Sequence, residues 1–178
     1  MSKTLLIVNL GTPNKPTYFS VYKYLRQFLM DGRVINRNPI LRFILVNLII
    51  VPIRSFTSSK VYKEVWDKDT GSPLLHNTKK LAEKLRVKLP DYNVEFAMRY
   101  QNPSLESVLN KILVNNPDEI IILPLFPHYA AATTGSVYEE ISRIISKNGL
   151  YRKLHLSINF MTTRSLLMLG LKKPKNLI

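Results

Sequence analysis

Two short, continuous apolar runs constrain the fold of this chain more than any other feature. Residues 4–10 (TLLIVNL) and 119–125 (EIIILPL) are almost wholly apolar, and Gly11, Thr12 and Pro13 end the first of them. Runs of this length are typical of strands in a parallel sheet, because helices cover both faces of such a sheet. We therefore expect both runs to be interior strands.

Segments with helical periodicity alternate with segments that favour strands. Apolar residues recur at helical spacing near residues 18–30, in a helix expected to follow Asn77 and Thr78, and in another expected to begin at Asn102 and Pro103. Residues 154–160 alternate with a period of two, as a strand does. This order predicts an α/β three-layer sandwich, with a parallel sheet of about four strands.

Composition narrows the range of partners. The net charge is +14, from 26 basic and 12 acidic residues. The basic residues are dispersed, which does not favour nucleic acid and leaves an anionic membrane or an anionic small molecule. The chain has no cysteine, so it has neither a disulfide nor a thiolate metal site, which suits a reducing cytoplasm. The first ten residues predict no signal peptide.

One further stretch is strongly apolar, from Ile40 to Ile53 (ILRFILVNLIIVPI). It contains Arg42, Asn47 and Pro52 and is shorter than the ~20 residues that cross a bilayer. A buried or lip helix is one interpretation. The second is an apolar lip that makes peripheral contact with a membrane surface or a flat apolar ligand, and the third is a transmembrane span. The predicted location is cytoplasmic, with membrane association as an option.

Four segments share the order and spacing of one family's motifs. They are VNLGTP at 8–13, residues 62–74 with GSPL at 71–74, AMRY at 97–100 before Pro103, and LPLFPHY at 123–129 with TTGS at 133–136. Together they resemble the amino-terminal half of the ferrochelatases. The resemblance implies a chelatase-like fold, one of two similar domains. It also implies a lyase of haem biosynthesis that inserts ferrous iron into protoporphyrin IX or coproporphyrin III.

A porphyrin is a flat apolar disc with acidic propionate edges, so its site needs apolar walls and cations at the rim. The resemblance places Leu10 against the ring face, Arg26 and Arg33 near the propionates, and Arg99 and Tyr100 on the metal side. The alternative interpretations are that Leu10 is a core residue and that the arginines are solvated charges at helix ends. The full set of expected porphyrin-binding residues is Leu10, Gly11, Thr12, Pro13, Arg26, Arg33, Ser72, Pro73, Arg99, Tyr100, Tyr129 and Thr134.

The catalytic base is not identified in this sequence. Metal insertion requires two pyrrole N–H protons to leave, and a nearby group must accept them. The family uses a histidine in a Ser-Ala-His-Ser type motif and a later glutamate, both expected beyond Ile178. His128, which follows a predicted strand, is a candidate base. We expect no metal ligand and no permanently bound cofactor, with ferrous iron as a substrate.

The last residues depart from the family pattern. Residues 161–178 contain four basic side chains and no acidic one. We expect an amino-terminal ferrochelatase domain over residues 1–160 and an aberrant, poorly packed basic tail over 161–178, produced by a frameshift or truncation.

Two other functions stay open. One is a non-catalytic tetrapyrrole-binding half-domain, which the missing base favours. The other is a chelatase relative that uses another metal, which the segment at 62–74 and the triplet Met98, Arg99 and Tyr100 disfavour. We expect weak porphyrin binding and no iron insertion by the chain itself.

Overall fold

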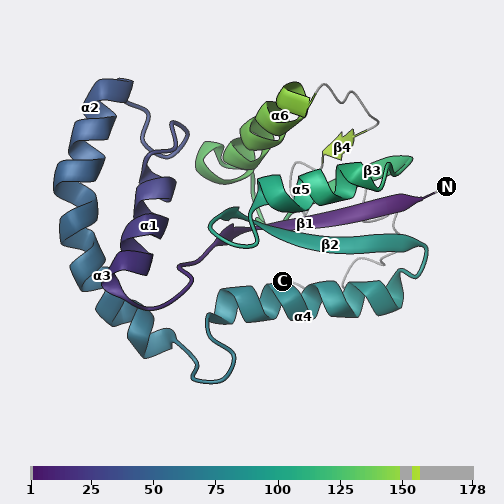
Figure 1. Cartoon of the computed structure of the whole chain (residues 1–178), viewed down its shortest axis with the longest axis horizontal. Coiled ribbons are helices and arrows are strands. Elements are labelled where there is room, and N and C mark those ends of the chain that lie inside the picture. The colour runs from purple at the N-terminus through teal and green to yellow at the C-terminus, as the bar shows by residue number, and fades with distance from the viewer. Residues whose placement is uncertain (1, 149–153, 157–178) are drawn as a thin grey trace.

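Four parallel strands form the central sheet of the computed structural model, which describes residues 2–148 and 154–156 (Figure 1). The sheet order is β2-β1-β3-β4, and all three pairings are parallel. The predicted α/β fold with two interior strands, β1 and β3, is therefore confirmed. The strands are β1 (Lys3–Gly11), β2 (Tyr92–Tyr100), β3 (Glu119–Pro124) and β4 (Leu154–Leu156).

Helices cover both faces of the sheet, as predicted. The helices α5 (Leu105–Val114) and α6 (Ser136–Asn148) lie on one face and α4 (Pro73–Lys88) on the other (Figure 1). Side chains alternate along β1, so Leu6 and Val8 pack in the core under α5 and α6, whereas Leu5 and Ile7 pack in the core that α4 covers. The two apolar cores explain why β1 has no polar face.

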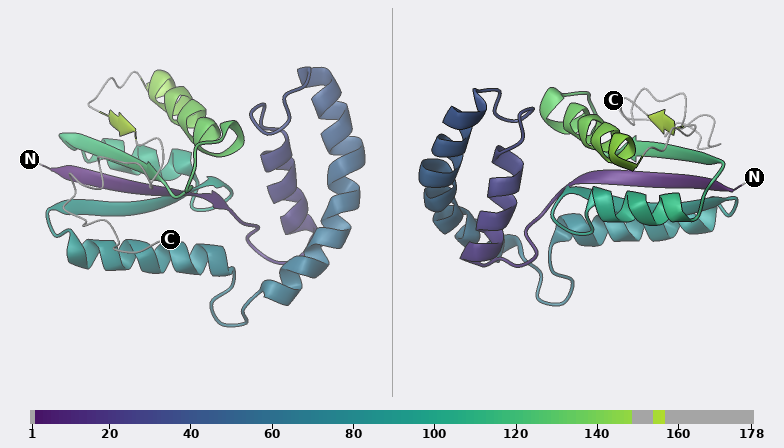
Figure 2. Two further views of the ribbon diagram at one scale, coloured as in Figure 1. Left: turned by 180° about the vertical axis from the view of Figure 1, so that it is seen from behind. Right: turned by 45° about the horizontal axis from the view of Figure 1, so that its top comes forward.

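A helical arm, residues 18–65, stands beyond the end of the sheet toward which β1 and β2 run (Figures 1 and 2). Its own apolar core joins α1 to the long helix Pro39–Val65 through Val21, Leu25 and Val51, and includes Tyr100 at the end of β2. The arm therefore borders the carboxyl ends of the strands. Its elements are α1 (Tyr18–Leu29), α2 (Pro39–Ile44), the π-helical segment η1 (Leu45–Ile50) and α3 (Val51–Val65).

Two helix starts differ from the prediction. The helix expected after Asn77 and Thr78 begins earlier, at Pro73, because Ser72 adopts the extended backbone of an N-cap and proline suits the first turn. The helix expected at Pro103 begins later, at Leu105. The residue before it, Ser104, caps this helix by accepting a hydrogen bond from the Ser107 N–H at 3.1 Å.

The apolar stretch from Ile40 to Ile53 is not a buried helix, so that interpretation is wrong. Most of its large apolar side chains face solvent, with exposed fractions of 72% at Ile40, 69% at Leu48 and 65% at Ile53, whereas Val46 and Val51 are buried in the core of the arm. The helix is also longer than the apolar stretch, because α2, η1 and α3 form one continuous helix of 27 residues, Pro39–Val65. By length and composition this helix could cross a membrane.

Some expectations fall outside the described residues. They include the second part of the strand predicted at 154–160, the domain boundary at residue 160 and the nature of the tail at 161–178. These stay predictions.

Gly11 is required where β1 and β2 end together, and a substitution tests this. A Cβ atom on Gly11 would lie 2.0 Å from the Tyr100 carbonyl oxygen, and its φ of +115° favours glycine. We expect Gly11→Ala to lower the free energy of unfolding by about 3 kcal/mol or more. Gly71→Ala is the matched control, because Gly71 has a φ of +77° but its nearest neighbour atoms are 3.8 Å away.

The control variant should lose only about 1–2 kcal/mol, the strain of a left-handed backbone without a clash. Urea denaturation followed by circular dichroism measures both variants. Equal losses would show that the close approach of Gly11 to β2 is not needed.

Candidate functional site

The four motif segments meet at the carboxyl ends of the strands. The first and third are neighbours because Gly11 pairs with Tyr100 in the β1–β2 ladder. The first and second are joined where Ser72 Oγ donates a hydrogen bond to Thr12 Oγ1 at 2.9 Å. The third and fourth are joined by the hydroxyls of Tyr100 and Ser136, which lie 3.1 Å apart. Ligands bind at this end of the sheet in parallel α/β folds, so the segments form a candidate site.

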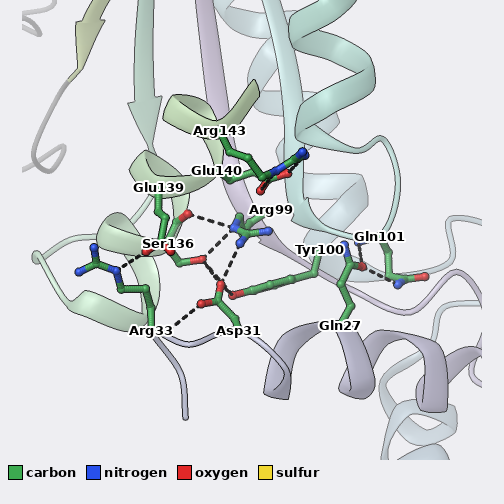
Figure 3. A network of polar contacts seen from close by, with 10 residues as sticks. All are labelled: Gln27, Asp31, Arg33, Arg99, Tyr100, Gln101, Ser136, Glu139, Glu140 and Arg143. Carbon is green, nitrogen blue, oxygen red and sulfur yellow. Dashed lines mark hydrogen bonds and ion pairs between the residues drawn. The ribbon is translucent and has the colours of Figure 1, made fainter. Parts of the chain in front are cut away.

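A polar network at this end centres on Asp31, in the loop after α1 (Figure 3). One oxygen, Asp31 Oδ2, accepts hydrogen bonds from Arg99 Nη2 at 2.8 Å, Tyr100 OH at 2.8 Å and Ser136 Oγ at 2.5 Å. The other oxygen, Oδ1, accepts from the Arg33 backbone N–H at 2.7 Å. The network therefore joins the arm, β2 and the start of α6.

The surroundings of Asp31 favour its charged form. Burial alone would raise the pKa of this carboxyl, but hydrogen bonds from Ser136 and the Arg33 N–H oppose burial. The Tyr100 hydroxyl and the Arg99 charge act in the same direction, so the pKa of Asp31 lies below its usual value. Burial raises the pKa of the Tyr100 phenol, which therefore stays protonated and serves as a donor.

Three further ion pairs surround this network. The Arg33 Nε donates to Glu139 Oε2 at 2.5 Å, and this pair ties the loop after α1 to α6. On α6, Arg143 pairs with Glu140 at 2.8 Å and with Glu106 of α5 at 3.2 Å. The hydrogen bond between Arg143 and Glu140 is the main cause that lowers the pKa of Glu140.

An open cleft of about 1060 Å³ lies beside the network, between α1 and the helices α5 and α6. Its wall on α1 includes Lys23 and Arg26, and Asp31 and Arg99 line it as well. Cations therefore outnumber acids along this wall. The complete lining is Phe19, Tyr22, Lys23, Arg26, Gln27, Met30, Asp31, Arg99, Gln101, Glu106, Glu140 and Arg143.

The structure brings together several of the predicted residues. Thr12 and Ser72 are both buried and hydrogen-bonded, and Arg99 and Tyr100 share Asp31 as their acceptor. Leu10 is partly buried and packs against the core of the arm, which agrees with the alternative that it is core. The others also lie around this end: Arg26 on the cleft, Arg33 beside Asp31, Pro13 buried after β1, Pro73 exposed at the start of α4, and Thr134 buried in η2 (Ala131–Gly135).

His128 and Tyr129 lie in the exposed loop after β3, and the Tyr129 hydroxyl lies close to Gly135, next to Ser136. Tyr129 is 54% exposed. Within residues 2–148 and 154–156 no hydrogen bond joins His128 to Arg99 or Tyr100. The same residues contain no group of three or more His, Cys, Asp or Glu side chains that could hold a metal ion.

Sequence reasoning missed Asp31 and Ser136 as site residues. Asp31 comes before Gly32, and an Asp-Gly pair after an amphipathic segment indicates only that a helix stops. Ser136 ends the TTGS segment but is one of several hydroxyls there. The available signal was the position of Asp31 between Arg26 and Arg33, two arginines already expected at the site.

The lowered pKa of Asp31 makes a prediction about stability and pH. A carboxyl whose pKa is lower in the folded state stabilises the fold above its unfolded pKa, near 3.8, and loses this effect as pH falls through the folded pKa. We expect Asp31→Asn to lower the free energy of unfolding by about 2 kcal/mol at pH 6. This deficit should shrink below pH ~3, where the wild-type carboxyl is also neutral.

Urea titrations at several pH values measure the difference. The control is Asp91→Asn, since Asp91 is exposed between α4 and β2. A deficit that stays constant down to the lowest pH would mean that the charge of Asp31 does not stabilise the fold.

Known proteins match most of this chain. The ferrochelatase family model matches residues 2–168. A ferrochelatase of Francisella tularensis subsp. holarctica (strain OSU18) is 49% identical over 146 residues, 82% of this chain and 44% of the relative. The ferrochelatase of Francisella tularensis subsp. novicida (strain U112) is 48% identical over the same shares. The chain thus spans about 44% of the length of the curated relatives it matches.

One solved structure matches this chain at low sequence identity. It is a putative cobalamin (vitamin B12) biosynthesis CbiX protein from Marinobacter aquaeolei, with a TM-score of 0.49 and 13% sequence identity over 94% of this chain and 88% of that one. Family membership is decided by the sequence matches, which cover more than four fifths of the residues at close to half identity. The chain therefore belongs to the ferrochelatase family.

Proposed function

We propose that this chain takes part in the insertion of ferrous iron into a porphyrin, protoporphyrin IX or coproporphyrin III, in haem biosynthesis. The observation that carries the proposal is the meeting of the four motif segments at one end of the sheet, through Gly11 with Tyr100, Thr12 with Ser72, and Tyr100 with Ser136. The chain spans less than half the length of its relatives. The reaction that the full-length relatives catalyse is therefore a proposal for this chain, which family membership alone does not establish.

The proposed binding mode follows from the chemistry of the ligand. Propionates need cations, and Arg26 lines the open cleft, with Arg33 close by on the same loop as Asp31. The ring needs an apolar and closely approaching wall, which Leu10 and the backbone at Gly11 would supply at the end of β1. In this proposal the remaining expected contacts surround the same strand ends. They are Thr12, Pro13, Ser72, Pro73, Tyr129 and Thr134.

Iron is a substrate in this proposal, and no resident cofactor is assigned. The pyrrole protons must pass to a base, and geometry decides which group qualifies before its pKa matters. His128 is the candidate of this chain, although its exposed loop separates it from the hydrogen bonds of Arg99 and Tyr100. In this proposal Arg99 binds and orients the porphyrin or ordered water at the ring centre, and the buried Tyr100 supports it through their shared acceptor, Asp31.

Porphyrin titration tests the proposed site. Protoporphyrin IX should bind the wild-type chain saturably, and Arg99→Ala should weaken the affinity about tenfold, the loss expected for a charged hydrogen-bond donor. Val87→Ala is the control, since Val87 is 82% exposed on α4. Equal affinity of all three proteins would contradict the placement of the porphyrin at Arg99.

Haem formation with anaerobic ferrous iron tests the base in the same preparations. If the wild-type chain forms haem, we expect His128→Ala to form it at the same rate, because no described hydrogen bond joins His128 to Arg99 or Tyr100. A loss of about 10²–10⁴-fold would instead make His128 the base. Porphyrin binding with no haem formation by the wild-type chain would favour the non-catalytic tetrapyrrole-binding half-domain.

We also propose that the arm contacts a membrane surface peripherally, on the cytoplasmic side, which suits a chain without cysteine. The exposed apolar side chains of the long helix support this. Residues 37–65 also include five basic side chains and one acidic one, so an anionic lipid surface is favoured. The exposed apolar residues are Ile40, Leu41, Phe43, Ile44, Leu48, Ile49, Ile53, Phe56, Val61 and Val65.

A peripheral position is favoured over a span by the partner of the long helix. The core of the arm joins α1 to the long helix through Val21, Leu25 and Val51. A span would therefore draw α1, with Lys23 and Arg26, into the hydrocarbon, at about 2.5–3.5 kcal/mol for each charge. A helix lying in the interface leaves these charges in water.

Vesicle sedimentation tests the membrane proposal. The double variant Leu48→Asp with Ile53→Asp should bind vesicles of phosphatidylcholine and phosphatidylglycerol about tenfold more weakly, because two exposed apolar contacts are lost. The control is Val87→Asp with Val114→Asp, two side chains that are 82% and 84% exposed on the body of the molecule. Equal weakening by both double variants would point to a general charge effect and contradict the proposal.

A further inference from the structure

We propose that Asp31 is a positioning residue, whose carboxylate fixes the Arg99 guanidinium on the wall of the cleft and the buried Tyr100 phenol behind it. The importance of these two side chains for porphyrin rests on the proposed function. The positioning itself rests on the contacts of Asp31 and can be tested without porphyrin.

A single carboxylate oxygen sets the direction of the two side chains. Asp31 Oδ2 accepts from Arg99 Nη2 and from Tyr100 OH, each at 2.8 Å. The side chain of Asp31 is 7% exposed and that of Arg99 is 13% exposed, so water competes little for these bonds. Hydrogen bonds to charged groups are stronger and more directional in such surroundings.

Ser136 makes the arrangement rigid by holding Arg99 at a second point. Arg99 Nε donates to Ser136 Oγ at 2.7 Å and to the Ser136 carbonyl at 3.1 Å. Ser136 Oγ in turn donates to Asp31 Oδ2 at 2.5 Å. The guanidinium is therefore held through both Nε and Nη2, and it cannot rotate toward solvent without breaking both contacts.

An amide at position 31 would reverse part of this arrangement. An asparagine has one acceptor oxygen and an NH₂ group that only donates. Neither orientation can give Arg99, Tyr100 and Ser136 the same charged acceptor. Tyr100 would lose a strong partner, and Arg99 would lose its counter-charge. The Ser136 hydroxyl, which Asp31 orients, would also lose its acceptor and with it the position in which it holds Arg99 Nε.

The variant should still fold, because the arm has a separate apolar attachment to the sheet. The ring of Phe28 contacts the ring of Tyr100 edge to face, with centroids 5.2 Å apart. Gln27 Oε1 also accepts from the Gln101 N–H at 2.9 Å. Neither contact uses Asp31.

The experiment combines a double-mutant cycle with a spectroscopic signal from Arg99. Protoporphyrin IX is titrated into wild type, Asp31→Asn, Arg99→Gln and the double variant. The control is Glu95→Gln, a carboxylate on the same strand as Arg99 that pairs with Arg86 and Lys111. The Arg99 Nε–H resonance is identified in the nuclear magnetic resonance spectrum by its loss in Arg99→Gln.

We expect Asp31→Asn to weaken porphyrin binding about tenfold and to add nothing to Arg99→Gln, since both changes remove the same positioned guanidinium. The Arg99 Nε–H signal should exchange rapidly with water in Asp31→Asn and stay protected in Glu95→Gln. A fully additive double variant would show that Asp31 acts only on stability and would overturn the proposal. An unchanged Nε–H signal in Asp31→Asn would also overturn it.

Two remaining outcomes are also decisive. If wild type binds no porphyrin, the proposed function fails, and the Arg99 signal alone decides whether Asp31 positions that side chain. If Asp31→Asn does not fold, Asp31→Glu replaces it, because it keeps the charge and moves the carboxylate by one methylene. If the Arg99 signal stays protected and the porphyrin affinity is unchanged in Asp31→Glu, the proposal is overturned. A partial loss of signal protection and of porphyrin affinity, smaller than that expected for Asp31→Asn, would support it.

Discussion

The close approach of Gly11 to the Tyr100 carbonyl is the constraint on which the rest of this end of the molecule depends. No side chain fits there, since a Cβ atom would lie 2.0 Å from the carbonyl oxygen. The approach keeps β1 and β2 paired to their last residues. Tyr100 is thereby placed where the sheet, the arm and the polar network all meet.

Tyr100 joins two kinds of attachment. Its buried ring belongs to the apolar core of the arm and contacts Phe28, while its hydroxyl donates to Asp31. The apolar contacts tolerate small shifts, because dispersion and burial have little directional preference. The hydrogen bonds to Asp31 do not tolerate such shifts, since three donors share one oxygen. The arm is thus held by burial and oriented by charge, and a wide apolar surface on its long helix stays available for a partner.

The fold was largely predictable because its strands are short and apolar on both faces. Residues 4–10 and 119–125 indicated interior parallel strands, and both expectations are confirmed. Helix starts were less predictable: Ser72 acts as an N-cap where the periodicity pointed to Asn77 and Thr78. The long helix of the arm was misjudged in part, since hydropathy measures how apolar a stretch is and not whether another element covers it.

The sequence by itself determined the family and the end of the sheet where its motifs belong, because motif spacing and strand periodicity are local properties of the chain. Only the tertiary structure decided that Asp31 is the acceptor for Arg99, Tyr100 and Ser136. These partners lie 68, 69 and 105 residues away in the sequence. No local pattern encodes such a meeting. It arises because β2, α6 and the loop after α1 converge beyond the same strand ends, where a buried carboxylate needs donors.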